Sequence, residues 1–335
     1  MRLLLPFLFF SCLIGCKNSS NDTSEEVVIY TSLDRVHSEP VFRKFEQETG
    51  IKVRAVYDTE ASKTVGLVNR LIAEKNRPKA DVFWNSEILR TLILKEKGLL
   101  TPYTSPNAAA IPDTFKDSAG YWTGFAARAR VIFYNTDRVQ EPPTTLAELS
   151  TPQWREQVAI ANPLFGTTNT QLAVWWQEWG PDKTQGYLTS LKQNGVHIVP
   201  GNGPARDLVA SGEIALCLTD TDDAWQAISK KRPVAMIYPD QEGEGTLLIP
   251  NTVCLIANGP NPETGKKLID YLLSEETESY LAHSASAQIP VRDSVPRPEH
   301  VRSLEQIVHQ KVDFEAARQQ VTTASEWAQR EFLNP

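Results

Sequence analysis

The sequence predicts an α/β protein with two lobes that are joined by two crossing strands and have a cleft between them. From residue 27 onward, short apolar strands alternate with amphipathic helices, which is typical of a sheet covered on both faces. The alternation falls into two blocks, and an apolar stretch stands on either side of the second block, at residues 129–134 and 252–257. The chain of 335 residues is also long enough for two domains of about 150 residues each.

The first block consists of three strand-helix units. Strands are expected at residues 27–30, 53–56 and 81–84. Each is followed by a helix whose apolar residues recur at helical spacing. In the first helix, Ser38 is the expected cap, Pro40 stands in the first turn and Gly50 ends the helix.

The second block repeats this pattern. Strands are expected at residues 158–161, 196–199, 214–218 and 234–238, and helices at 168–179, 187–191, 204–211 and 223–229. The chain then returns to the first lobe, so that lobe 1 comprises residues 27–128 and 253–335 and lobe 2 comprises residues 129–252. Helices are expected at 266–273 and 278–282, and a long amphipathic segment at 303–332 should pack across the outside.

The N-terminus predicts export and a lipid anchor. Arg2 and the apolar run of residues 3–13 fit a secretory signal that is too short to span a bilayer of roughly 30 Å. Residues 13–16 (LIGC) resemble a lipobox, where a signal peptidase cuts before the cysteine and Cys16 receives the lipid. We therefore expect a signal peptide at residues 1–15, a polar linker at 16–26, and a mature protein anchored on the outer side of a bacterial membrane, periplasmic or at the cell surface.

Charge and motifs exclude several classes of function. The net charge of −7 and the lack of a long basic run argue against a nucleic-acid partner. The five histidines show no HExxH spacing, and neither a GxSxG elbow nor a phosphate or dinucleotide loop follows any strand. We therefore expect no enzymatic activity. Cys217 and Cys254 each lie in an apolar run and are interpreted as two separate buried thiols, with a disulfide left as the alternative.

Polar residues follow four of the predicted strands, where ligands of open α/β sheets collect. They lie at residues 31–34, 84–87, 162–169 and 219–223. The last segment places Asp220, Asp222 and Asp223 within four residues. One aspartate would be enough to cap the following helix, but three that face Asp34 and Glu87 across a cleft would repel one another. A cation or an amine would neutralise them.

A second set of residues is a candidate anion site. Gly166, Thr167 and Thr168 open a predicted helix, where backbone N–H groups and hydroxyls can hold an anion, although a plain helix cap explains them equally well. Arg128 and Arg130 stand two apart in the first crossing strand and so share a face. One of them could point into the cleft and pair with carboxylate or phosphate oxygens.

Several segments, in their order and spacing, resemble the solute-binding proteins of ABC importers, specifically the ferric-iron-binding group. They are residues 28–32, 45–53, 80–84, 98–100, 128–131, 212–214 and 266–272. The resemblance implies a periplasmic-binding-protein-like fold whose two lobes close on a solute by a hinge motion. It also implies a monomer that delivers the solute to a membrane permease driven by a separate ATPase.

The resemblance further implies a set of metal ligands. The first metal position of that group often carries a histidine and corresponds here to Asp34, and the second is a glutamate that matches Glu87. Two adjacent tyrosines of the group correspond to Asp222 and Asp223, and this departure removes the phenolate ligands that suit Fe³⁺. The group's carbonate or phosphate lies on an arginine and a helix start that match Arg128 and residues 166–168.

Three ligands remain open at this point. A hard metal ion, with Fe³⁺ favoured, suits the all-oxygen set. An organic cation such as a polyamine could use the acids with Trp84, Trp225 or Tyr30. An aminophosphonate could place its anion on Arg128 and the helix start at Thr167 and Thr168, and its amine on the aspartates. The residues expected to contact the ligand are Tyr30, Ser32, Asp34, Trp84, Glu87, Arg128, Gly166, Thr167, Thr168, Asp220, Asp222 and Asp223. Apart from a bound metal ion, no cofactor is expected. A sensor or an enzyme on the same two-lobed fold is the alternative from another class.

Overall fold

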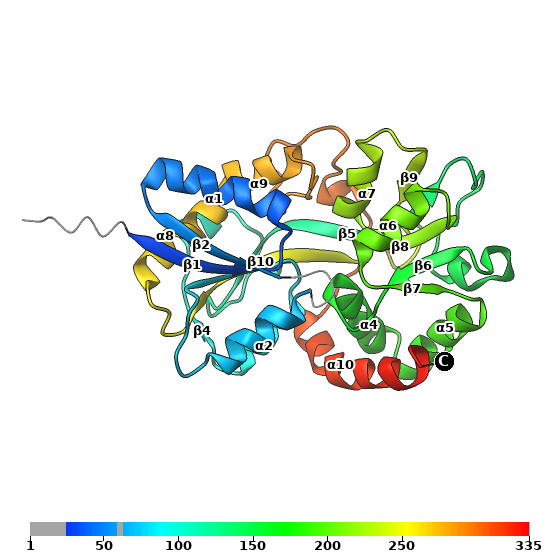
Figure 1. Ribbon diagram of the computed structural model, residues 1–335, viewed down its shortest axis with the longest axis horizontal. Helices are drawn as coiled ribbons and strands as arrows, with labels where there is room; N and C mark the ends of the chain where they lie inside the picture. The colour runs from blue at the N-terminus through cyan, green and yellow to red at the C-terminus, as the bar shows by residue number, and fades with distance from the viewer. Residues whose placement is uncertain (1–24, 59–62, 335) are drawn as a thin grey trace, which may run out of the picture.

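The computed structural model describes residues 25–58 and 63–334, and it confirms the α/β class. Two lobes lie side by side along the long axis of the molecule (Figure 1). The predicted signal peptide, Cys16 and almost all of the predicted linker lie outside the described residues. Within the described part of the chain, no helix combines the length and the apolar character needed to cross a membrane.

The first lobe is built on a parallel arrangement of strands. Its strands are β1 (Glu26–Thr31), β2 (Lys52–Tyr57), β3 (Val82–Asn85) and the short β4 (Leu100–Thr101). Its helices are α1 (Arg35–Thr49), α2 (Val65–Ala73), α3 (Leu89–Glu96), α8 (Pro262–Leu272) and α9 (Glu275–His283). Because β1 pairs in parallel with both β2 and β3, their carboxyl ends meet at one edge of the sheet.

The second lobe follows the same plan. Its strands are β6 (Val158–Ala161), β7 (His197–Val199), β8 (Leu216–Asp220) and β9 (Val234–Ile237). Its helices are α4 (Gly166–Glu178), α5 (Pro181–Gln193), α6 (Asn202–Ala210) and α7 (Thr221–Ile228). β6 pairs in parallel with β7 and β8, so the helices that follow these strands begin at a common edge.

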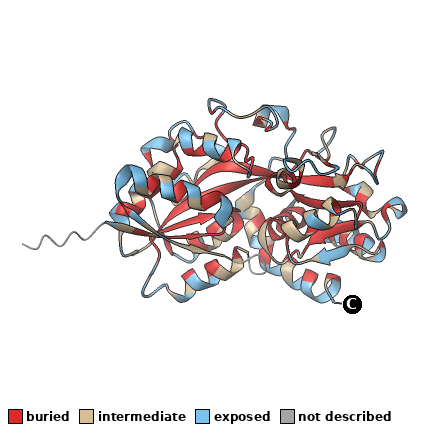
Figure 2. Ribbon diagram, turned by 45° about the horizontal axis from the view of Figure 1, so that its top comes forward, coloured by how far each residue is buried: buried red, intermediate tan, exposed pale blue. Residues whose placement is uncertain are grey.

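Two long strands, β5 (Thr123–Asn135) and β10 (Leu248–Ile256), connect the lobes. The first half of β5 pairs with β10 and the second half pairs with β8 and β9, while β10 also pairs with β3 and β4. The strand order β2-β1-β3-β10-β5-β8-β6-β7 therefore runs through both lobes without a break. Both strands are almost entirely buried (Figure 2).

The crossing strands are irregular where they face each other. Ala126 in β5 has a φ of +46°, and the register of β10 shifts between Ile249 and Asn251. The Asn251 side-chain amide donates to the Ala126 carbonyl, and the Ala126 N–H donates to the Glu278 carboxylate at 2.9 Å. Side chains thus satisfy the backbone groups that the irregular pairing leaves open.

Two tryptophans of α4 and both described cysteines are buried. Trp175 and Trp176 are buried in lobe 2, and Trp179 stacks on Trp175 with ring centroids 5.1 Å apart. Cys217 and Cys254 are unpaired and buried, and burial raises the pKa of both thiols. The interpretation as two separate buried thiols is confirmed.

The start of α1 differs from the prediction. The helix begins at Arg35 rather than at Ser38, because the Ser38 N–H donates to the Asp34 carbonyl at 3.0 Å and so forms a helical bond one turn earlier. The Ser38 hydroxyl donates to the same carbonyl at 3.0 Å and does not cap the helix. Pro40 consequently lies inside the helix. The carbonyl that its N–H would have bonded belongs to Val36, which is 67% exposed and can be hydrated.

The C-terminal segment is helical only in its second half. A 3₁₀ turn at Leu304–Gln306 is followed by extended chain, and α10 (Phe314–Trp327) begins where the Asp313 carboxylate accepts a hydrogen bond from Ala316 N–H at 3.0 Å. A π-helical turn, Ala328–Phe332, ends the segment. α10 packs on α4 of lobe 2 and on α3 of lobe 1, so it covers the outside of both lobes (Figure 1).

Candidate functional site

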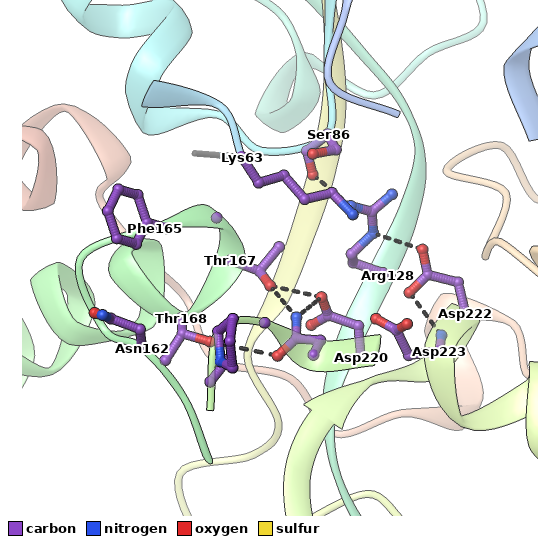
Figure 3. A pocket seen from close by; sticks show the side chains of 15 residues that line it. Lys63, Ser86, Arg128, Asn162, Phe165, Thr167, Thr168, Asp220, Asp222 and Asp223 are labelled. Atoms are coloured by element: carbon purple, nitrogen blue, oxygen red, sulfur yellow. Dashed lines mark hydrogen bonds and ion pairs between the residues drawn. The ribbon is translucent and has the colours of Figure 1, made fainter. Parts of the chain in front are cut away.

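A cavity of about 410 Å³, counted to its opening to solvent, lies between the lobes (Figure 3). It is lined by Lys63, Ser86, Arg128, Ala161, Asn162, Phe165, Gly166, Thr167, Thr168, Pro200, Gly201, Asn202, Asp220, Asp222 and Asp223. Most of these residues follow the strands β6, β7 and β8 or open the helices α4, α6 and α7. Lys63 and Ser86 reach the cavity from lobe 1.

Three buried aspartates form one wall of the cavity. A carboxylate oxygen from each of Asp220, Asp222 and Asp223 lies within 4.8 Å of the others. Asp220 occupies the cap position of α7, yet its carboxylate does not bond the helix backbone. It accepts hydrogen bonds from Arg130 at 2.8 Å and Thr167 at 2.5 Å instead. Helix capping therefore does not explain Asp220, while Asp222 and Asp223 lie in the first turn of α7.

Each acidic side chain around the cavity has a basic partner. The pairs are Asp34 with Lys63 at 2.8 Å, Asp220 with Arg130 at 2.8 Å, Asp222 with Arg128 at 3.4 Å, and Asp223 with Arg206 at 3.4 Å. Arg130 is fully buried and also donates to Gln171 at 2.9 Å. The acidic wall is thus partly neutralised from within the chain.

Despite these pairs, the pKa of two of the aspartates lies above the ordinary value. Burial raises the pKa of Asp222, although Arg128 opposes it. Burial, together with the charge of Asp222, raises the pKa of Asp223 well above its ordinary value. A bound cation would relieve both effects, because it stabilises the ionised form of each group.

Two helix starts beside the acidic wall are suited to an oxyanion. The helices α4, α6 and α7 all begin at the cavity and none has a side-chain cap, but the first turn of α7 already carries Asp222 and Asp223. Their first N–H groups lack partners within the helix and point outward from its start. Arg128 is 3% exposed, and its Nε makes no hydrogen bond beyond the long ion pair with Asp222. A buried donor in the same cavity as the starts of α4 and α6 favours a negatively charged group.

The predicted ligand residues divide into two groups. Seven of them line the cavity: Arg128, Gly166, Thr167, Thr168, Asp220, Asp222 and Asp223. Tyr30, Ser32 and Trp84 do not line it. The Tyr30 hydroxyl donates to the Glu74 carboxylate at 3.0 Å, the Ser32 hydroxyl donates to Asn85 at 2.8 Å, and Trp84 packs against Phe42 and Phe125 in the core of lobe 1.

Glu87 is also absent from the cavity lining, because its carboxylate is used elsewhere. It accepts hydrogen bonds from the N–H groups of Leu89 at 2.6 Å and Arg90 at 3.1 Å, which open α3. It accepts a third from the Thr170 hydroxyl of lobe 2 at 2.8 Å. The structure does not bring Glu87 together with the aspartates. Its carboxylate instead bonds the start of α3 and links the two lobes through Thr170.

Asp34 contributes only indirectly. Its carboxylate does not cap α1 and bonds Lys63, which lines the cavity. Burial would raise the pKa of Asp34, but the charges of Lys63, His37 and Arg128 together outweigh burial, and the pKa lies below its ordinary value. Asp34 therefore positions the Lys63 ammonium and does not itself line the cavity.

Lys63 and Asn202 are cavity residues that the sequence reasoning missed. Lys63 precedes α2 and follows no strand directly, so a search at strand ends could not find it. Asn202 lies between two glycines at the start of α6. Its side-chain amide donates to Thr167 at 2.9 Å and to Asp220 at 2.8 Å. The glycine-rich segment before a helix is therefore the sequence feature that could have identified Asn202 as a cavity residue.

Comparison with known proteins agrees with this geometry. Residues 78–319 match the family model of bacterial extracellular solute-binding proteins. Iron uptake protein A1 of Synechocystis is 30% identical over 292 residues, which cover 83% of this chain and 79% of that protein. A Salmonella typhimurium periplasmic protein named for 2-aminoethylphosphonate binding is 28% identical over 296 residues, which cover 85% of each chain.

Solved structures show the same two-lobed architecture. The periplasmic binding protein AfuA of Actinobacillus pleuropneumoniae superimposes with a TM-score of 0.83 and 23% identity, covering 93% of this chain and 100% of that one. The shared fold, the interlobe cavity and the match over most of the sequence lead to one assignment. The chain belongs to the family of bacterial extracellular solute-binding proteins, the exported binding components of ABC importers.

Proposed function

We propose that this chain captures a hard metal ion, with ferric iron as the first candidate, and delivers it to the permease of an ABC importer. The observation that supports this cargo is the cluster of Asp220, Asp222 and Asp223, whose oxygens lie within 4.8 Å of one another beside a buried cavity. Carboxylate oxygens are the ligands that hard cations prefer. Two relatives are also named for iron uptake.

A second candidate cargo is an aminophosphonate, and a separate observation favours it. The cavity brings the three aspartates together with Arg128 and the uncapped starts of α4 and α6, a combination that matches a molecule with an ammonium group and a phosphonate group. The Salmonella relative named for 2-aminoethylphosphonate binding supports it. A polyamine is less well supported, because Tyr30 and Trp84 do not line the cavity.

Native mass spectrometry with elemental analysis of the purified protein separates these candidates. A hard metal cargo predicts a metal-bound mass, and after the metal is removed, calorimetric titration with ferric ion should restore it with one ion per chain. An aminophosphonate cargo predicts binding of 2-aminoethylphosphonate by the metal-free protein. If the purified protein binds neither probe, the proposed cargo is wrong.

The ferric complex should also differ in colour from sites that use tyrosine. No tyrosine is found among the described residues that line the cavity, so no phenolate is available there as an iron ligand. We expect the ferric complex to lack the visible phenolate-to-iron charge-transfer band. A strong visible band that appears on iron binding would contradict ligation by the three aspartates.

We further propose that the mature protein is a monomer held at the membrane by a lipid on Cys16. The lipobox-like residues 13–16 support the anchor, and a polar linker after them would let the lobes reach a permease. Cys16→Ser should shift the protein from the membrane fraction to the soluble fraction, and mass spectrometry of the wild-type N-terminus should show acyl chains. Uptake of the cargo by cells, lost when the chain is deleted, distinguishes transport from a sensing role.

A further inference from the structure

Lys63 of lobe 1 contacts lobe 2 through its backbone carbonyl and also extends its side chain into the cavity between the lobes. It stands just before α2 of lobe 1, and its carbonyl accepts a hydrogen bond at 3.2 Å from the N–H of Gly166, the first residue of α4 in lobe 2. Its side chain extends into the cavity toward the acidic wall (Figure 3), and its ammonium donates to Asp34 at 2.8 Å. Lys63 and the start of α4 belong to different lobes, so this contact exists only while the lobes are closed on each other.

The ammonium of Lys63 also acts on the aspartates of lobe 2. Burial raises the pKa of both Asp222 and Asp223, and the charge of Lys63 opposes that rise at each of them. The residues that line the cavity carry three carboxylates against the two cations Lys63 and Arg128. Removing Lys63 would leave Arg128 as the one cation among the described lining residues.

The position of Lys63 depends on closure of the lobes. When two lobes open around a hinge, contacts between them separate while each lobe stays intact. Opening would withdraw Lys63 from Gly166 and from the aspartates, because these residues belong to lobe 2. Closure therefore brings a positive charge up to the place where a metal ion would bind. A bare cation would meet repulsion there, whereas an oxyanion would gain a charge-assisted partner.

We propose that Lys63 determines the cargo specificity of this site: it admits to the closed cavity a cargo that carries an oxyanion group, and it disfavours a bare metal ion. The oxyanion would lie between the Lys63 ammonium, Arg128 and the start of α4. Both candidate cargoes share this chemistry, since a metal ion can arrive with a phosphate-like anion and an aminophosphonate carries its own. This inference rests on the proposed function and deepens it.

Two variants of Lys63 test this role. Lys63→Met removes the charge but keeps an unbranched side chain, and Lys63→Arg keeps the charge. Lys79→Met, at an exposed lysine of the same lobe, is the matched control. Unchanged thermal unfolding of the ligand-free variants would show that the fold is intact.

Calorimetry then uses three probes: 2-aminoethylphosphonate, ferric ion with excess inorganic phosphate, and ferric ion without phosphate. Lys63→Met should lose about tenfold or more in affinity for whichever of the first two probes the wild type binds, and gain about tenfold for ferric ion alone. Lys63→Arg and Lys79→Met should stay near wild type. Equal affinities of Lys63→Met and wild type for all probes would overturn the role of Lys63 while leaving the proposed function in place. A wild-type protein that binds none of the probes would overturn the proposed function, and the inference with it.

Discussion

Asp222 and Asp223 are adjacent, and burial raises the pKa of both; the charge of Asp220 adds to the rise at Asp222, and the charge of Asp222 adds to the rise at Asp223. Asp222→Asn and Asp223→Asn each keep the shape of the side chain while removing one carboxylate. We expect each to weaken binding of a hard metal ion by at least about tenfold, because losing a direct ligand should cost at least as much metal affinity as losing a residue that only bonds to a ligand. Calorimetric titration is the measurement. Asp293→Asn, at an exposed aspartate, should bind as wild type.

The same two residues predict opposite pH trends for folding and for metal binding. Burial and the charge of Asp222 hold the pKa of Asp223 well above its ordinary value, so the folded protein binds more protons than the unfolded chain between those two values. The slope of the unfolding free energy with pH has the sign of the protons bound by the unfolded minus the folded state, which is negative here. The ligand-free protein should therefore lose stability as pH rises through this window.

Metal binding must displace these protons, so the metal affinity should fall as pH decreases through the same window, by about tenfold per unit for each proton released. Thermal unfolding of the ligand-free wild type and of Asp223→Asn, scanned from about pH 4 to pH 8, checks the folding trend. An identical pH slope in the two proteins would rule out this account of Asp223.

Glu87 matches a ligand position in sequence, but in the structure it accepts hydrogen bonds from backbone N–H groups. Its carboxylate accepts the N–H groups at the start of α3, and the side chain is 1% exposed. Glu87→Ala should lower the free energy of unfolding by about 0.5–2 kcal/mol, the usual cost of losing a helix cap. Denaturant unfolding measures this loss. The number of metal ions bound per chain should not change, and a lost metal site would return Glu87 to the ligand set.

Among the helices, α10 shows which parts of an element local sequence patterns can predict. Its amphipathic pattern was recognised, but the pattern also continued through residues 303–313, where the chain is mostly extended. The onset at Phe314 depends on the Asp313 cap, a local signal. The contact with α3 and α4 of different lobes depends on the tertiary arrangement, which periodicity does not contain.

The end of this segment should be essential to lobe 2. Phe332 is 2% exposed and packs in the cluster that also contains Trp176 and Leu172. Phe332→Ala should lower the free energy of unfolding by about 3–5 kcal/mol, because it leaves a cavity in this core. Val308→Ala, at a residue that is 51% exposed, is the control and should change little. Equal stability of the two variants in denaturant unfolding would show that the C-terminal turn is dispensable.

For the molecule as a whole, closure of the lobes is stabilised by contacts outside the cargo cavity. The Thr170 hydroxyl of lobe 2 donates to Glu87 at 2.8 Å, and Arg90 of lobe 1 donates to Asn169 at 2.6 Å. These bonds link α3 to α4 without using a cavity residue. They should favour the closed arrangement even before cargo binds.

Thr170→Val removes one of these bonds with almost no change in volume. Its loss should cost the closed state about 1 kcal/mol, and so weaken cargo binding severalfold while leaving the cavity residues in place. Small-angle X-ray scattering of the ligand-free variant should show a larger radius of gyration than the wild type. Thr145→Val, at a threonine within lobe 2, should leave both quantities unchanged.

Much of this protein follows from the sequence alone. The order of strands and helices, the buried tryptophans and thiols, and the aspartates after β8 are local patterns of hydrophobicity and residue type, and the structure contains them. The tertiary structure decided which polar side chains share a cavity. Tyr30 and Glu87 find partners in neighbouring elements, whereas Lys63 reaches the acidic wall from the other lobe. A hydrogen bond between residues far apart in the chain leaves no periodic trace in the sequence, so only the folded arrangement could show where each charge is used.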